Sequence, residues 1–156
     1  MASVGTLRLR LRRRLTWALD GMNSLAWSEI VSGLASRDVD ASVNAASRLR
    51  SESSAEDIPA LLELLDTGDF IVREAAAWPL AELAGLDHLP QLLLAYQRGF
   101  DEGHDNDGFS AALLEIPALF PAEARRVIEA LARSSDEPLR GHAEWLLEFC
   151  QPEVTR

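Results

Sequence analysis

The sequence is poor in several residue types, and each shortage narrows the classes of protein to consider. Its 156 residues include one cysteine, Cys150, and no lysine, so all 15 basic residues are arginine. A single cysteine excludes an internal disulfide framework and fits a reducing, cytoplasmic location. The lack of lysine reflects genome composition and favours no function class. No apolar run approaches the length of a membrane span.

Aromatic residues and strand-like patterns are also scarce. Phe, Trp and Tyr make up 6% of the chain, whereas hydrophobic residues make up 47%. Alanine, leucine and glutamate dominate, and β-branched residues show almost none of the alternation that is typical of strands. The chain is long enough to bury a continuous core. The sequence therefore predicts an all-α protein, either one domain or a short solenoid.

Motifs for catalysis and metal binding are missing too. The sequence contains no glycine-rich phosphate loop, no Gly-x-Ser-x-Gly elbow and no cysteine pair at metal-binding spacing. His88 and His142 stand in positions typical of capping or packing histidines, and Cys150 lies among apolar residues as a buried thiol does. We therefore predict a protein that is not an enzyme and that uses neither a metal nor a cofactor.

What the sequence does contain is a repeated helical hairpin, which is clearest in residues 55–83. Apolar residues recur at helical spacing on both sides of a break at Thr67-Gly68-Asp69. Sliding the chain against itself by 31, 38 and 67 residues aligns this hairpin with one copy upstream and two copies downstream. Because a single hairpin cannot bury its apolar stripe alone, we expect the copies to stack.

The clearest hairpin also carries a recurrent motif. Asp69 is followed by Val72-Arg73, by the small pair Ala76-Ala77 and by Leu80, and the last hairpin repeats this motif in part. The motif resembles the HEAT-like repeats of the bacterial phycobilisome-lyase type. The resemblance implies a short α-solenoid of about four stacked helical hairpins, which we assign to residues 22–156.

In HEAT-like repeats of this type, turn aspartates and arginines form a ladder between neighbouring turns. Ser42 and Ala111 replace the arginine in the first and third hairpins, so the resemblance implies an incomplete ladder in this chain. The implied ladder residues are Asp69, Arg73, Asp136 and Arg140.

Charge divides the chain near Met22. Residues 1–21 carry five Arg and one Asp, a charge of +4, whereas residues 22–156 carry ten Arg and 24 acidic residues, a charge of −14. The leader has neither the apolar core nor the cleavage site of a secretory signal and has no place in the repeat pattern. We expect it to be poorly ordered, and we favour Met22 as the native start.

The negative charge of the repeat region indicates which class of partner the protein binds. Nucleic-acid binding requires a basic surface that neutralises phosphates, which this region lacks. An acidic surface favours a basic protein partner and fast, salt-sensitive association. We expect no nucleic acid and no membrane among the partners, and the oligomeric state stays open.

Residues 100–108 form the most highly charged stretch. The spacing of its acids does not fit a calcium loop of EF-hand type, and His104 alone is too few nitrogen ligands for zinc. A solvated loop in which Asp107 caps the next helix explains the stretch simply. It is also a candidate acidic contact loop, because the hairpin spacing is longest here. Its carboxylates are Asp101, Glu102, Asp105 and Asp107.

Two tryptophans define a second candidate contact surface. At about 100° per residue, Trp78 and Trp145 take the same position on the second helix of their hairpins, away from the expected buried stripe. Second helices often line the inner face of stacked hairpins, so both are candidate anchors for a basic partner. Packing against a neighbouring repeat is an equally good interpretation for each. The acidic residues that flank them are Glu74, Glu82 and Glu148.

Three function classes remain open. The first is a non-catalytic scaffold that binds another protein through its inner helix face and its acidic loop. The second is an immunity protein or other inhibitor that covers the cationic active site of a toxin such as a nuclease. The third, a bilin-lyase-like enzyme subunit, is implied only by the family resemblance, because repeats of this kind carry no chemistry of their own.

Overall fold

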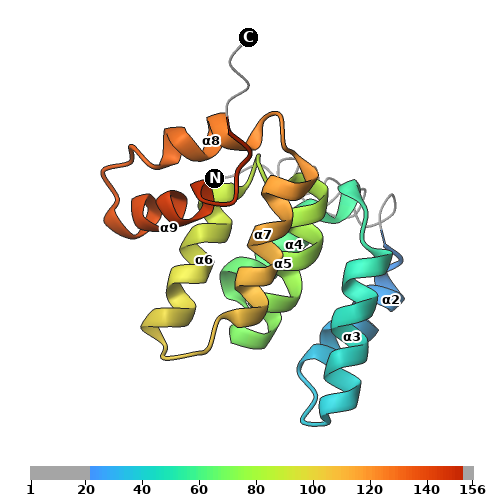
Figure 1. Cartoon of the computed structure of the whole chain (residues 1–156). Helices are drawn as coiled ribbons and strands as arrows, with labels where there is room; N and C mark the ends of the chain where they lie inside the picture. The colour runs from blue at the N-terminus through green and yellow to red at the C-terminus, as the bar shows by residue number, and fades with distance from the viewer. Residues whose placement is uncertain (1–21, 153–156) are drawn as a thin grey trace, which may run out of the picture.

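The computed structural model describes residues 22–152, and every regular element in that range is helical (Figure 1). This confirms the all-α prediction. The expectations for residues 1–21 lie outside the described residues. The helices are α2 (Ser24–Leu34), α3 (Val39–Glu52), the 3₁₀ turn η1 (Ala55–Asp57), α4 (Ile58–Thr67), α5 (Phe70–Ala84), α6 (Leu89–Asp101), α7 (Asp107–Leu119), α8 (Ala124–Leu131) and α9 (Glu137–Leu147).

Local sequence sets where several helices begin. Asp38, Asp69 and Asp136 precede α3, α5 and α9, and each side chain accepts a hydrogen bond from a backbone N–H of the first turn. Proline occupies an early position of α4, α6 and α9, where its missing N–H costs no helical bond. The turns before α3, α5 and α9 therefore follow directly from capping chemistry.

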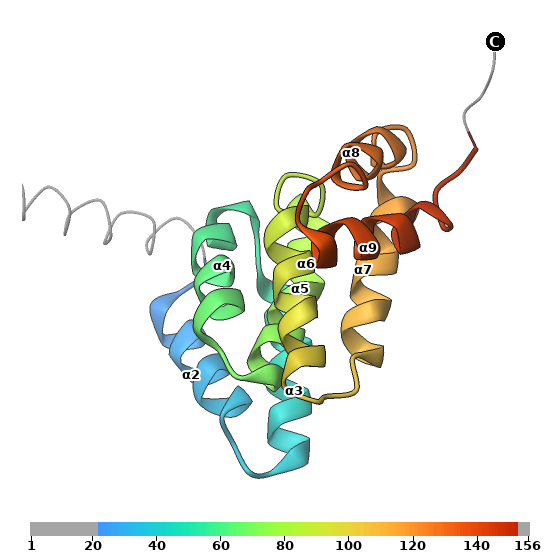
Figure 2. The ribbon, with the colours of Figure 1, turned by 90° about the vertical axis from the view of Figure 1, so that its left-hand side faces the viewer.

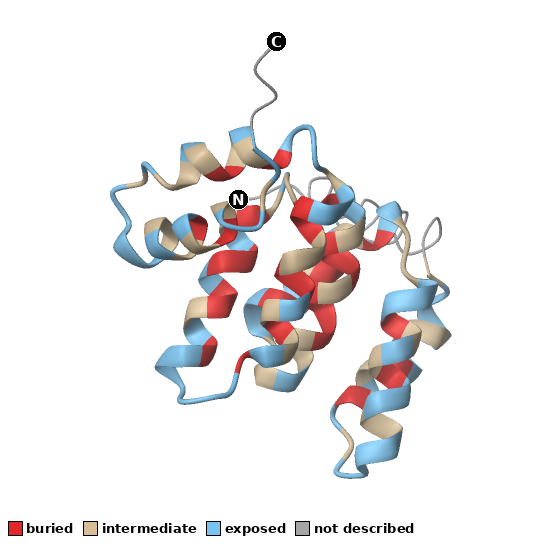
Figure 3. Ribbon diagram, viewed as in Figure 1, coloured by how far each residue is buried: buried red, intermediate tan, exposed pale blue. Residues whose placement is uncertain are grey.

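The second helices of the first three hairpins lie side by side. Helix α5 packs against α4 within its own hairpin and against α3 and α7 of the neighbouring hairpins, while α4 also contacts α6. Small residues allow this close packing, since Ala76, Ala77 and Ala81 of α5 are fully buried (Figure 3). This arrangement is compatible with a short solenoid of helical hairpins.

The last hairpin is turned relative to the others. Helix α9 packs on α8 and α6 more than on α7, and the two last helices lie across the ends of α6 and α7 (Figure 2). Ala143 and Leu146 supply the buried contacts of α9. The second helix of this hairpin is therefore directed toward α6, a first helix, instead of continuing the row formed by α3, α5 and α7.

A row of leucines and isoleucines fills the space between the helices. Leu61, Leu80, Leu92 and Leu113 are completely buried and come from α4 to α7 in turn, so one core runs through the hairpins. None of the helices in residues 22–152 combines the length and the apolar character that crossing a bilayer requires.

Candidate functional site

Arg73 is the most deeply buried charged side chain of the described residues, with 1% of its surface exposed. Its Nη1 atom donates to the carbonyl oxygen of Gly68 at 3.1 Å and to Glu102 at 3.3 Å, and its Nη2 atom donates to the other oxygen of Glu102. Asp69 instead caps α5 by accepting from the N–H of Val72. The implied pairing of Arg73 with Asp69 is therefore wrong.

In the last hairpin the implied pairing of Arg140 with Asp136 is wrong in the same way. Its Nη1 atom donates to the carbonyl oxygen of Ser134 at 3.2 Å, while Asp136 caps α9 through the N–H of Leu139. The physical reason is the same at both turns. The aspartate at the N-cap faces the free N–H groups of the first turn, so the arginine one turn later reaches back to an unpaired carbonyl of the preceding turn.

Glu102 gathers two arginines and a histidine at the end of α6. Besides Arg73, it lies 3.7 Å from Arg98 Nη2 and 3.6 Å from His104 Nε2. The hydrogen bond from Arg73 is the largest cause that lowers the pKa of Glu102 below its ordinary value of 4.5; burial opposes it, and the neighbouring positive charge adds to it. This carboxylate therefore ties α5 to the end of α6.

Acid unfolding should report this contact. Because the pKa of Glu102 is lower in the folded protein than in the unfolded chain, its stabilising contribution is complete above pH 4.5 and is lost as the pH falls through the folded value. Glu102→Gln should therefore weaken the acid dependence of the urea midpoint below about pH 5. In an Arg73→Met background the same change should have little further effect. Parallel pH profiles for wild type and Glu102→Gln would contradict the assignment.

An open hollow lies between the α4–α5 turn and the α6–α7 loop. Its volume is about 710 Å³. On one side Phe70 stacks on His104, with ring centroids 4.2 Å apart, and Ile71 is half exposed beside them. The lining residues are Thr67, Gly68, Asp69, Phe70, Ile71, Arg73, Arg98, Glu102 and His104.

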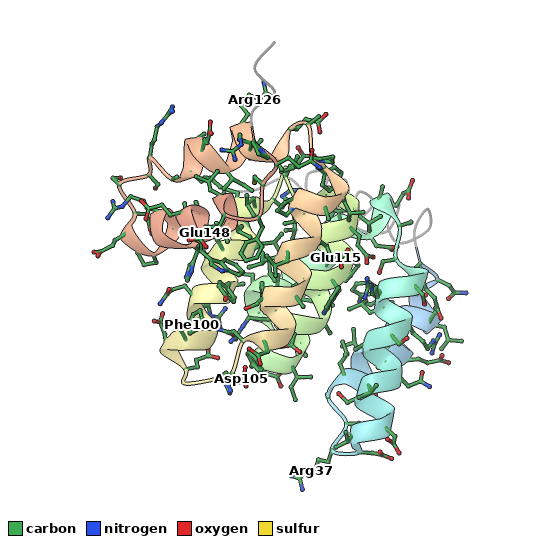
Figure 4. All side chains as sticks on the ribbon, viewed as in Figure 1. Arg37, Phe100, Asp105, Glu115, Arg126 and Glu148 are labelled. Carbon is green, nitrogen blue, oxygen red and sulfur yellow. The ribbon has the colours of Figure 1, made fainter. Side chains whose placement is uncertain are left out.

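Exposed carboxylates lie in the lining of this hollow and along the loop that bounds it. Asp69 lies in its lining, and Asp101, Asp105 and Asp107 lie in or next to the α6–α7 loop, at the end of the molecule where Figure 4 labels Phe100 and Asp105. Within residues 22–152 none of these four carboxylates pairs with an arginine. The structure thus brings together the predicted acidic loop and the turn of the clearest hairpin.

Asn106, which sequence reasoning missed, holds the acidic loop in place. It is 4% exposed, precedes α7, and its Nδ2 atom donates to the carbonyl oxygen of Tyr96 at 3.2 Å. Asp107 does not cap α7 as predicted, because it is already the first helical residue and its own N–H donates to Asp105. An asparagine among three aspartates was the only sequence signal for this role, and it was too weak to interpret.

Trp78 already holds a cation from the same chain. The guanidinium carbon of Arg50, on α3, lies 4.2 Å from the centre of the Trp78 ring. Arg50 Nε also donates to Glu82 at 2.6 Å. Two residues predicted to attract a basic partner thus bind an arginine of the neighbouring hairpin.

Trp145 meets different neighbours. Its ring stacks on Tyr96 of α6 at 5.8 Å and contacts Phe149 edge-on at 5.7 Å. His142 adds to this cluster by contacting Tyr96 and hydrogen-bonding Gln97 at 2.7 Å, and burial lowers the pKa of His142. The structure therefore places Trp145 at the contact between α9 and α6, as the packing interpretation expected, and Glu148 is exposed just after α9.

The side chain of Glu74, on α5, packs against the beginning of α7. It is half buried, and burial raises its pKa although the N–H of Phe109 donates to it. In this position the negative charge of the carboxylate is stabilised by the unpaired N–H groups and by the positive dipole end at the beginning of α7. Glu74 therefore joins α5 to α7.

Neither a related protein nor a cluster of metal ligands in residues 22–152 adds a further assignment. No protein-family model, curated protein or solved structure matches the chain. Within residues 22–152 no group of three His, Cys, Asp or Glu side chains lies close enough to hold a metal ion.

Proposed function

We propose that this protein is a non-catalytic, cytoplasmic interaction module that binds a basic partner protein through the hollow between the α4–α5 turn and the α6–α7 loop. One observation carries the proposal. A hollow that offers apolar surface from Phe70 and Ile71 has one exposed carboxylate without an arginine partner, Asp69, in its lining, and three more, Asp101, Asp105 and Asp107, in or next to the α6–α7 loop that bounds it. Charge around an apolar centre is the usual composition of a protein-binding surface.

The distribution of arginines supports the same surface. Elsewhere arginines neutralise nearby carboxylates, as in the pairs Arg48–Glu52, Arg50–Glu82 and Arg125–Glu129. At the hollow, Arg73 and Arg98 are directed toward Glu102, so neither Asp69 nor the carboxylates in or next to the α6–α7 loop have an arginine partner. Uncompensated negative charge next to an apolar hollow attracts and orients a positively charged partner.

An inhibitor or immunity protein that covers the cationic active site of a toxin would use the same acidic surface, and it remains the second candidate function. The carboxylates supply the complementary charge that such a complex requires. A bilin-lyase-like role gains no comparable support, because burial raises the pKa of the Cys150 thiol and so disfavours its nucleophilic thiolate form.

Site-specific photo-cross-linking in the native host tests the proposed function. A photoreactive residue at Ile71 should cross-link a basic protein, whereas the same residue at exposed Val43, on α3, should not. Changing Asp69, Asp101, Asp105 and Asp107 to asparagine should abolish the cross-link, since asparagine preserves the cap at position 69. A control variant in which Asp38, Asp40, Glu56 and Glu63 are neutralised loses the same amount of negative charge elsewhere on the molecule. This control should still form the cross-link. Equal loss in both variants would contradict the proposed site.

A further inference from the structure

We infer that Trp78 and Glu82 form a binding site for an arginine side chain of the partner, and that Arg50 of the same chain occupies this site in the free protein. The inference rests on the proposed function in one respect, namely the basic character of the partner. The site lies on α5 beside α3, apart from the hollow at the end of α6.

The geometry of the site suits a guanidinium group. Trp78 and Glu82 are one helical turn apart on α5 and therefore present their side chains on the same face. The Arg50 guanidinium carbon lies 4.2 Å from the ring centre, and both Nε and Nη2 of Arg50 reach the same oxygen, Oε1, of the Glu82 carboxylate. Stacking on an aromatic face, together with two guanidinium nitrogens on one carboxylate oxygen, favours the planar guanidinium of arginine over lysine.

Arg50 is free to leave this site. Its side chain is 43% exposed and that of Glu82 is 29% exposed, so water competes for the ion pair and the pair is weak. Helix α3 does not depend on it for attachment, because Ala45 and Leu49 of α3 are buried in the core. An arginine from a partner can therefore replace Arg50 while α3 stays packed on α5.

Arg50 and an arginine of the partner compete for the same ring and the same carboxylate. Since Arg50 must first be displaced, the contact lowers the affinity of the free protein for its partner, as an internal competitor does.

Binding of a tetra-arginine peptide to the full chain tests this inference. Arg50→Ala should raise the affinity about fivefold to tenfold, as expected for opening one cation–π site with a carboxylate. The indole N–H resonance of Trp78, assigned by its loss in Trp78→Phe, should shift on titration. Arg48→Ala removes the same charge from the same helix and should leave the affinity near the wild-type value. A tetra-lysine peptide should gain less than the arginine peptide from Arg50→Ala.

The controls make each result decisive. In Arg50→Ala, the further change Glu82→Gln should remove the gain, while thermal melting shows that the fold persists. An equal gain in Arg48→Ala, or a Trp78 resonance that does not respond to the peptide, would overturn the inference. Retention of the Arg50→Ala gain in the variant with asparagine at positions 69, 101, 105 and 107 would support the arginine site independently. If the four-asparagine variant loses partner cross-linking while the matched charge control keeps it, the proposed function is supported whether or not the arginine site is.

Discussion

Replacing Arg73 with alanine should lower the free energy of unfolding by about 2 to 4 kcal/mol, the sum of a lost buried hydrogen bond and a cavity. Arg73 is 1% exposed, and its loss leaves the carbonyl oxygen of Gly68 without its side-chain donor. The ion pair adds little to this figure, because the Glu102 side chain is 40% exposed and solvent screens it. Urea unfolding measures the change.

Two variants separate the causes of this loss. Arg73→Met keeps most of the aliphatic volume, so it should recover the packing part but not the hydrogen bond to Gly68. Arg37→Ala removes the same charge at an exposed position in the turn between α2 and α3, far from the core (Figure 4), and should change stability by less than about 0.5 kcal/mol. Equal losses at Arg73 and Arg37 would show that Arg73 is not a structural residue.

Replacing Gly99 with alanine should cost about 2 to 3 kcal/mol, although alanine is the better helix former. A β-carbon at Gly99 would lie 2.1 Å from Oδ1 of Asn106. The buried amide must then move and give up its hydrogen bond to Tyr96. Because Asn106 precedes α7, the acidic loop should lose order together with stability, which hydrogen exchange of its amides would detect.

A matched substitution and a double mutant test the proposed clash. Gly141 lies within α9 and has open space where a methyl group would be added, so Gly141→Ala should stabilise the protein by about 0.5 to 1 kcal/mol. In an Asn106→Ala background, Gly99→Ala should cost much less than it does alone, since its clashing partner is gone. Additive losses would show that the close contact is not the cause.

The sequence by itself determined the helical class and the turns of the clearest hairpins. Helical spacing of apolar residues and the capping aspartates Asp38, Asp69 and Asp136 are local signals, because a cap bonds N–H groups within three residues of itself. The same locality made the charged loop at residues 100–108 evident, since charge density needs no knowledge of packing.

Only the tertiary structure decided which partners the side chains find across the hairpins. Helical geometry put Trp78 and Trp145 at one repeat position, but their surroundings differ because α9 packs onto α6. The ring of Trp78 therefore lies against Arg50, whereas the ring of Trp145 stacks on Tyr96. Arg73 likewise bonds Gly68 and Glu102 in place of an aspartate. Most of these contacts join residues of different helices. Which residues meet depends on how the packed helices are rotated relative to one another, and the apolar period of a single helix does not specify that rotation.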